Sequence, residues 1–152
     1  MSQLPTPRDP HYEHRVRDSF DRQIVMNTIG ATLDSVAPGK VEISFAFSDS
    51  LTQQHGFIHA GIVSTVLDSA CGYAAFSLMP ANAAVLTIEF KINLLAPAAG
   101  ERFKAVAQVQ KSGRTVSVAT GDMFAITGEQ QKHVASMTGT LMTIIDRDDV
   151  RG

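Results

Sequence analysis

One stretch of the chain combines residue types that can perform acid–base chemistry. A polar loop ending at Gly56 runs into an apolar helical segment, residues 58–76, whose middle holds one ionisable carboxylate, Asp68. Burying a lone carboxylate in apolar surroundings is costly unless the group is paired with another charge, is solvated from a cleft or takes part in a reaction. At the helix start, beside His59, the unpaired backbone N–H groups form a site for an anion. The pattern indicates a carboxylate base and an oxyanion site on one helix.

The spacing of these two groups predicts that a second subunit completes the site. Gly61 and Asp68 are seven residues apart, which is roughly 10 Å along a helix that rises about 1.5 Å per residue. Reacting groups must lie about 3 Å from the substrate centre, so one centre cannot contact both groups of the same chain. Two such helices related by a two-fold axis would place Asp68 of one chain near residues 59–61 of its partner. We therefore expect a homodimer.

Size and composition limit the classes of protein. The chain has 152 residues and a net charge of −2, which fits one domain without a strong affinity for polyanions. It has no basic run interleaved with aromatic residues, so we expect no nucleic-acid partner. No stretch reaches the roughly 18 unbroken apolar residues of a membrane span, and the N-terminus has no apolar signal core, so we expect no membrane association. The single cysteine, Cys71, predicts a buried, inert thiol and a cytoplasmic protein.

The hydrophobic pattern predicts an α+β domain. We expect a flexible tail over residues 1–10 and a single domain over residues 11–152 that begins with a helix at 12–26. A hairpin turns at Pro38-Gly39, and four extended runs follow the apolar helix in a meander, at 84–95, 103–110, 115–127 and 133–145. In the first of these runs Leu86, Ile88, Phe90 and Ile92 alternate with polar residues. A curved antiparallel sheet would then wrap around the one long helix, and its uncovered edges favour assembly.

The chain resembles a known family across residues 29–144. The residues that carry the likeness are Gln53-x-x-Gly56-x-x-His59-Ala60-Gly61 followed by Asp68, the run 86–100 with Pro97 and Gly100, and Lys111-Ser112-Gly113-Arg114. This combination resembles hotdog-fold acyl-CoA thioesterases of the phenylacetate-degradation type. Two positions depart from the family form, because Gln53 stands where Asn is common and Ala60 replaces the first Gly of a pair. The resemblance implies the hotdog fold and hydrolysis of a medium-chain fatty or aryl-acyl-CoA to the free acid and CoA.

The resemblance also assigns roles within the catalytic segment. Asp68 would be either the general base that activates water or a nucleophile that forms an anhydride, and the sequence does not separate the two. The N–H groups of Ala60 and Gly61 would polarise the thioester carbonyl. His59 would hold the carbonyl or orient the loop, and Gln53 would orient the attacking water. Thr65 lies on the helical face that carries Asp68 and is included in the site.

The remaining site residues are assigned to the substrate. Lys111, Arg114 and Lys91 would meet the phosphates of CoA, with Gly113 allowing the turn between the first two. The acyl pocket would lie beneath the central helix and across the dimer seam, with Phe57, Ile62, Val66 and Tyr73 as its lining. The family reading needs no cofactor and no metal, and we expect the dimers to pair into a tetramer.

Other interpretations stay open at this point. Asp68 could instead be satisfied by the hydroxyl groups of Ser64 and Thr65, one helical turn before it. A hotdog-type enoyl hydratase is disfavoured because no His follows Asp68 in the next five residues. A non-catalytic acyl-CoA sensor or carrier would share the same binding residues. A metal site at His55, His59 and Asp68 is disfavoured because Asp68 lies too far along the helix.

Overall fold

The N-terminal part of the chain forms two helices rather than the single helix expected over residues 12–26. The computed structural model describes residues 3–152. Helix α1 spans Tyr12–Arg22 and α2 spans Ile24–Ile29, with Gln23 between them in an extended conformation. Phe20 is buried on the α1 side of the break and Met26 on the α2 side, so both helices are anchored to the core.

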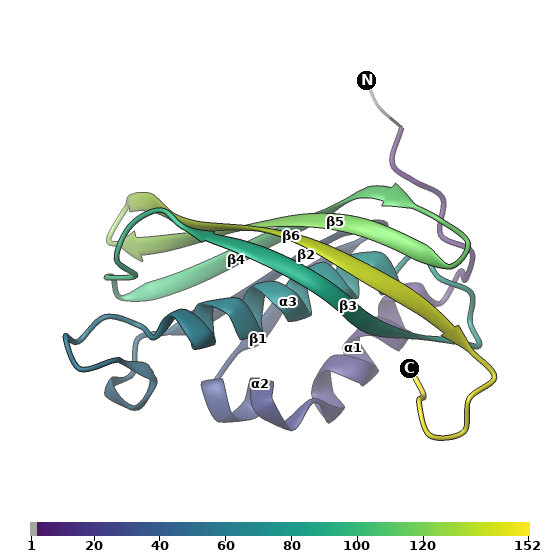
Figure 1. Ribbon diagram of the computed structural model, residues 1–152, viewed down its shortest axis with the longest axis horizontal. Helices are drawn as coiled ribbons and strands as arrows, with labels where there is room; N and C mark the ends of the chain where they lie inside the picture. The colour runs from purple at the N-terminus through teal and green to yellow at the C-terminus, as the bar shows by residue number, and fades with distance from the viewer. Residues whose placement is uncertain (1–2) are drawn as a thin grey trace.

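The six strands form one antiparallel sheet that curves around a long helix (Figure 1). The strands are β1 (Thr32–Ala37), β2 (Lys40–Ala46), β3 (Ala83–Leu94), β4 (Arg102–Ser112), β5 (Val116–Thr127) and β6 (Gln130–Ile145). The expected hairpin is present, and Gly39 adopts the positive φ of 74° that its turn requires. The sheet lies on one side of α3 (Ala60–Phe76), whereas α1 and α2 lie on the other side.

The strand order corrects the expected four-strand meander. The order is β1-β2-β4-β5-β6-β3, so of the four strands after α3 only β4, β5 and β6 follow one another as neighbours. After β2 the chain passes through a short 3₁₀ turn, Asp49–Leu51, and then α3 crosses the concave face of the sheet. This crossing carries the chain to the opposite edge, where β3 pairs with β6 alone.

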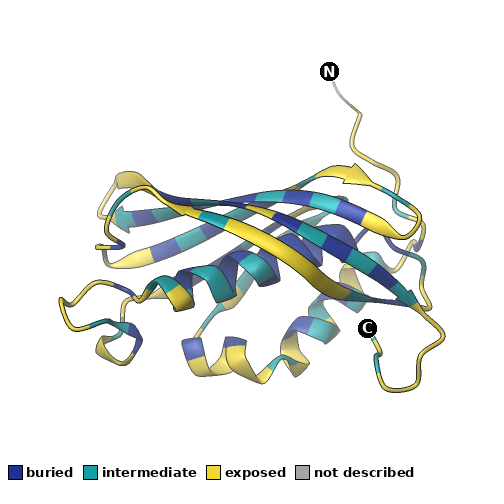
Figure 2. Ribbon diagram, viewed as in Figure 1, coloured by how far each residue is buried: buried dark blue, intermediate teal, exposed yellow. Residues whose placement is uncertain are grey.

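The core lies between α3 and the concave face of the sheet. In α3, Val63, Leu67 and Phe76 are buried. Figure 2 shows much of this helix as buried or intermediate beneath the sheet. The strands that face α3 carry small residues, which let the helix pack closely against the sheet. Gly121 is an example, because a larger residue there would crowd α3. A Cβ at Gly121 would lie 3.1 Å from Cys71 Sγ and 3.2 Å from Leu67 Cδ2. This close packing of one helix against a wrapped sheet confirms the expected architecture.

A β-bulge in β3 changes which side chains face the helix. Thr87 pairs with Leu141 and Phe90 with Gly139, and the register shifts between Thr87 and Glu89. Leu141 and Gly139 are buried beneath α3, so Thr87 and Phe90 also face the helix, whereas Leu86 faces outward. The expectation that Leu86 and Phe90 share one face was therefore wrong, because one extra residue in the bulge reverses the alternation.

Arginines of α1 bind both ends of the described chain. Asp9 is buried and accepts a 2.9 Å hydrogen bond from Arg15 Nε. Arg15 Nη2 donates to Met79 O at 2.8 Å just after α3. Near the other end, Arg22 Nη2 donates to Gly152 O at 2.6 Å. Within residues 3–152, no helix has both the length and the apolar character needed to cross a membrane.

Candidate active site

The start of α3 leaves one backbone N–H free. His59 is the N-cap residue, and its Nδ1 accepts a 2.8 Å hydrogen bond from the N–H of Gly61. The N–H groups of Ile62 and Val63 donate to His59 O. Among residues 3–152 the Ala60 N–H donates no hydrogen bond. Of the two N–H groups expected to polarise a carbonyl, the one of Ala60 is therefore available.

Asp68 is held by a residue from the edge strand. Thr87 Oγ1 donates to Asp68 Oδ1 at 2.7 Å. Asp68 is half-buried, and this burial raises the pKa of its carboxyl group, while the bond from Thr87 acts in the opposite direction. Because burial dominates, the carboxylate is a stronger base than an exposed aspartate. This environment suits a group that takes a proton from water.

The hydroxyl groups one turn before Asp68 do not satisfy it. Ser64 Oγ donates to Ala60 O and Thr65 Oγ1 donates to Gly61 O, each at 2.8 Å. Both hydroxyls are thus bonded to the backbone of their own helix. The partner of Asp68 is Thr87, which sequence reasoning missed because strict alternation assigns Thr87 to the outer face of β3.

Most of the expected site residues outside the basic turn line three separate cavities. A cavity of about 450 Å³ brings together Gln53, Phe57 and Ala60, with an apolar wall that includes Leu94 and Leu95. A second, of about 330 Å³, is lined by His59, Gly61, Ile62 and Thr65. A third, of about 150 Å³, holds Asp68 with Tyr73, Thr87, Ser19, Gln23, Ser69, Gly72 and Val85. Within the described chain Asp68 and the start of α3 therefore do not share a cavity.

Two residues that were expected to act at the site, Gln53 on the water and Val66 in the acyl pocket, make other contacts in the single chain. The Oε1 atom of Gln53 accepts hydrogen bonds from the backbone N–H groups of His55 and Phe57. The side-chain amide therefore stabilises the loop in which Gln53 itself lies. Gly56, inside that loop, has a φ of 84° that favours glycine. Val66 is fully buried in the core, so it packs against the sheet instead of lining one of these three cavities.

The basic residues assigned to CoA lie in two places. Lys111 is at the end of β4, and Arg114 follows in the turn to β5. A Cβ at Gly113 would collide with the carbonyl oxygen of Val116, so this turn requires glycine. Lys91 lies on β3, from which β4 is separated by β5 and β6, and its Nζ donates to Asn93 Oδ1 at 2.8 Å. One chain therefore brings Lys111 and Arg114 together but not Lys91.

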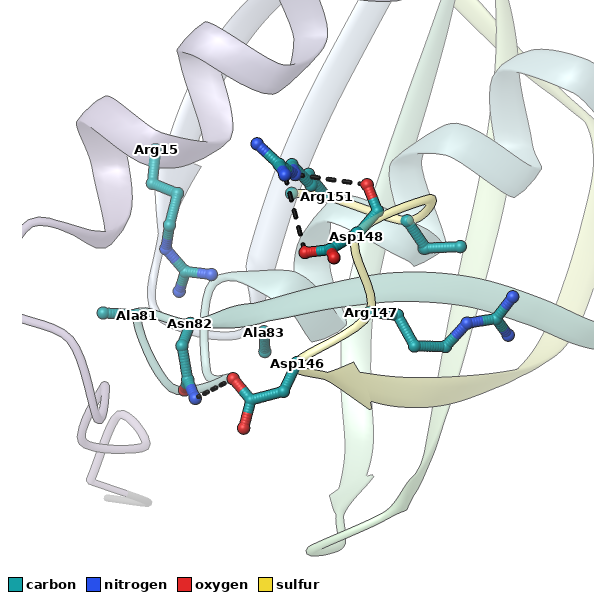
Figure 3. A pocket seen from close by; sticks show the side chains of 10 residues that line it. Arg15, Ala81, Asn82, Ala83, Asp146, Arg147, Asp148 and Arg151 are labelled. Atoms are coloured by element: carbon teal, nitrogen blue, oxygen red, sulfur yellow. Dashed lines mark hydrogen bonds and ion pairs between the residues drawn. The ribbon is translucent and has the colours of Figure 1, made fainter.

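A further cavity, of about 390 Å³, is lined by charged residues near the C-terminal end (Figure 3). Its arginines are already paired: Arg15 with Asp9, Arg147 with Asp149 and Arg151 with Asp148. The guanidinium of Arg15 also lies over the ring of Phe76, 4.2 Å from its centroid. The contact between Arg15 and Phe76 joins α1 to the end of α3, and the pairs of Arg147 and Arg151 are local to residues 147–151.

The one cysteine is poorly suited to act as a nucleophile. Burial raises the pKa of the Cys71 thiol to about 12, which leaves it protonated and unreactive near neutral pH. Among residues 3–152 no group of three or more His, Cys, Asp or Glu side chains is arranged to hold a metal ion.

Comparison with known families and proteins points to one group of enzymes. The model of the thioesterase superfamily matches residues 55–132, just over half of the chain. A putative esterase of Halobacterium salinarum is 29% identical over 109 residues, which are 68% of this chain and 72% of that protein. The medium/long-chain acyl-CoA thioesterase YigI of Escherichia coli is 28% identical over 98 residues, 56% of this chain and 61% of that protein.

Solved structures give the same picture. A thioesterase family protein from Silicibacter pomeroyi has a TM-score of 0.87 and 59% identity, covering 88% of this chain and 98% of that one. The Escherichia coli PaaI protein from the phenylacetic acid degradation operon has a TM-score of 0.79 and covers 88% of this chain and 93% of its own. At 22% identity, this second likeness concerns the fold alone.

Proposed function

Since this chain belongs to the thioesterase superfamily and has its hotdog fold, we propose that it hydrolyses acyl-CoA thioesters to a free acid and CoA. The observation that carries the proposal is Asp68, a half-buried carboxylate with a raised pKa that lines a cavity on the central helix. A relative of this chain is named as a medium/long-chain acyl-CoA thioesterase. The apolar wall of the 450 Å³ cavity favours a neutral acyl group, medium-chain or aryl.

The proposed mechanism uses Asp68 as a general base. Asp68 takes a proton from a water molecule, whose oxygen forms a bond to the thioester carbonyl carbon. The free N–H of Ala60 donates to the developing oxyanion, aided by the positive end of the α3 dipole. The C–S bond then breaks, and the sulfur takes the proton from Asp68. In the alternative, Asp68 itself attacks and forms an anhydride, which water then hydrolyses.

The site requires two subunits, and β3 offers the surface that joins them. This strand is an edge of the sheet, and four of its apolar side chains are 43–57% exposed: Leu86, Ile88, Phe90 and Leu94. It forms the exposed band across the front of Figure 2. A long apolar edge strand invites pairing with another chain. We propose that it pairs with β3 of a second copy.

The position of the two-fold axis follows from the contacts of β3. Thr87 contacts Asp68, whereas Leu94 shares the cavity of Ala60 and Val63. Antiparallel self-pairing about a point midway between residues 90 and 91 places Thr87 of one strand beside Leu94 of the other. Asp68 of one subunit then faces Ala60 of its partner. Gln53 and Phe57 would line the same composite site, and His59 would hold the loop.

The basic turn and the outer face of the sheet complete the proposal. Lys111 and Arg114 would bind the phosphates of CoA, and in an assembly Lys91 could come from another subunit. Val116, Met142 and Leu86 form one row of apolar side chains across three strands on the outer face. We propose that this row packs against a second dimer in a tetramer. The buried free thiol of Cys71 agrees with a cytoplasmic location.

A thiol-release assay tests the proposed function. Purified protein is supplied with acyl-CoAs of graded chain length and with aryl-acyl-CoAs, and free CoA is measured. We expect turnover of at least one substrate and loss of turnover in Asp68→Asn. Tight binding of acyl-CoA without turnover would show instead a sensor or carrier, and an unchanged rate in Asp68→Asn would remove Asp68 from the mechanism.

A further inference from the structure

Gln23 lies in the break between α1 and α2, and the break is fixed on both sides. Its backbone N–H donates to Phe20 O at 3.0 Å, and its carbonyl accepts from the Met26 N–H at 3.1 Å. Phe20 and Met26 are both buried. Hydrogen bonds and the packing of Phe20 and Met26 therefore hold the backbone of Gln23 in place. This fixes the point from which its side chain extends.

A serine of the central helix sets the orientation of the Gln23 amide. Ser64 and Thr65 donate to carbonyls four residues earlier, which is a common bond of helical hydroxyl groups. Ser69 Oγ instead donates to Gln23 Oε1 at 2.8 Å. Because Oε1 is the acceptor in this bond, the Nε2 N–H groups are the part of the amide left to donate elsewhere.

Gln23 and Asp68 line the same cavity of about 150 Å³. Six of its lining residues carry hydrogen-bonding side chains: Ser19, Gln23, Asp68, Ser69, Tyr73 and Thr87. Three hydrogen bonds pair them, Thr87 with Asp68 Oδ1, Ser69 with Gln23 Oε1 and Ser19 with Tyr73 OH. Within residues 3–152, Asp68 Oδ2 and Gln23 Nε2 are in no protein hydrogen bond.

One acceptor and one donor on the wall of a polar cavity match the needs of a water molecule, which donates and accepts at once. We propose that Gln23 Nε2 is the second protein contact of the water that Asp68 activates, an inference that rests on the proposed function. One hydrogen of the water passes to Asp68 Oδ2. One lone pair of its oxygen accepts from Gln23, and the other forms the bond to the thioester carbonyl carbon. The C–S bond breaks, and the sulfur takes the proton from Asp68.

Two substitutions of Gln23 separate this role from a structural one. Gln23→Leu removes the donor, and we expect kcat to fall roughly 10- to 100-fold with a smaller change in KM, because a displaced reacting group costs about 10²-fold. Gln23→Glu keeps an acceptor for Ser69 but places a second carboxyl group beside Asp68. It should move the acidic limb of the pH–rate profile to higher pH, since a like charge raises the pKa of Asp68.

Ser69→Ala tests the same contact from the other side. It frees the amide without removing it, so we expect a smaller loss of kcat. The double variant Ser69→Ala/Gln23→Leu should be no slower than Gln23→Leu, because both changes disrupt one contact. Gln131→Leu, at an exposed position in β6, is the matched control and should leave the rate unchanged. If Gln23→Leu does not fold, the kcat of Ser69→Ala and the pH–rate profile of Gln23→Glu still test the proposed contact.

The outcome distinguishes this inference from the proposed function. If the wild type releases CoA and Asp68→Asn does not, the proposed function stands. A Gln23→Leu variant within threefold of the wild-type kcat would then overturn the role of Gln23 alone, as would an unmoved acidic limb in Gln23→Glu. A wild type without turnover on any acyl-CoA would overturn both.

Discussion

Thr87 Oγ1 donates a 2.7 Å hydrogen bond to Asp68 Oδ1 and so joins the edge strand β3 to the middle of α3. The bond exists because the bulge at Ile88 turns Thr87 toward the helix. It links the candidate base to the strand on which we propose the dimer forms. The geometry of Asp68 is therefore coupled to the pairing of subunits.

Removing this hydrogen bond should change the pH dependence of the reaction. The carboxylate is the active form of Asp68, and burial already raises its pKa above the ordinary value of 3.8. The bond from Thr87 lowers that pKa, so Thr87→Val should raise it further and move the acidic limb of kcat/KM to higher pH. Thr87→Ser keeps the donor and should keep the limb in place. A Thr87→Val profile that overlays the wild type would exclude this coupling.

Asp68→Asn should make the protein more stable while it abolishes turnover. The pKa of Asp68 is raised in the folded state, so its ionised form opposes folding at neutral pH, and this effect disappears as the pH falls below about 3.8. Asn carries no charge, so the Tm of the variant should exceed that of the wild type near neutral pH. The gap should shrink as the solution is acidified. A lower Tm for Asp68→Asn at neutral pH would contradict this reading, and thermal melts at several pH values measure it.

Ala60→Pro removes a single N–H from the start of α3. Proline is favoured at the first helical position, and the preceding His59 has a ψ of 137° that is compatible with it. We expect a near-native Tm but a fall in kcat of roughly 10²- to 10³-fold, the cost of losing one oxyanion donor. Ala60→Gly retains the N–H and serves as the control. Equal rates for Ala60→Pro and Ala60→Gly would rule out this donor.

The basic turn between β4 and β5 should recognise the phosphates of CoA. Lys111→Ala and Arg114→Ala should each raise KM for an acyl-CoA by roughly 2- to 10-fold, and added salt should reduce the difference because exposed charges are screened. An acyl-pantetheine has no nucleotide phosphates, so its KM should not respond. Lys40→Ala, also exposed, is the control for a general loss of charge. Equal effects on both substrates would place the phosphates elsewhere.

The sequence predicts the main elements because their patterns are local. The apolar run through Asp68 gave the central helix, and the Pro38-Gly39 signal gave the first hairpin. Pairing between distant segments is not local, so the place of β3 beside β6 did not follow from order along the chain. The sequence also does not predict the break at Gln23, because Phe20, Ile24 and Val25 fit one continuous helical period, although Ile24 and Val25 are exposed in the structure.

The same limit applies to the site. The segment from Gln53 to Asp68 stood out because a loop, a helix start and a carboxylate follow one another in the sequence. Thr87 and Gln23 reach Asp68 through a bulge and a helix break, and neither irregularity has a strong sequence signal. Alternation assigns Thr87 to the wrong face. The contact of Gln23 with Ser69 joins residues 46 positions apart, and no sequence pattern predicts it.

Complementation between two inactive variants tests the central claim, that Asp68 of one subunit acts with the start of α3 in its partner. Asp68→Asn and Ala60→Pro are each assayed alone and then co-expressed as one mixed population. If the site is shared, each mixed dimer carries one site with both native groups. Random pairing then restores about a quarter of the wild-type CoA release. If the mixed population stays as inactive as the two parents, while mixed dimers are shown to form, Asp68 and Ala60 do not act across the interface and the account is wrong.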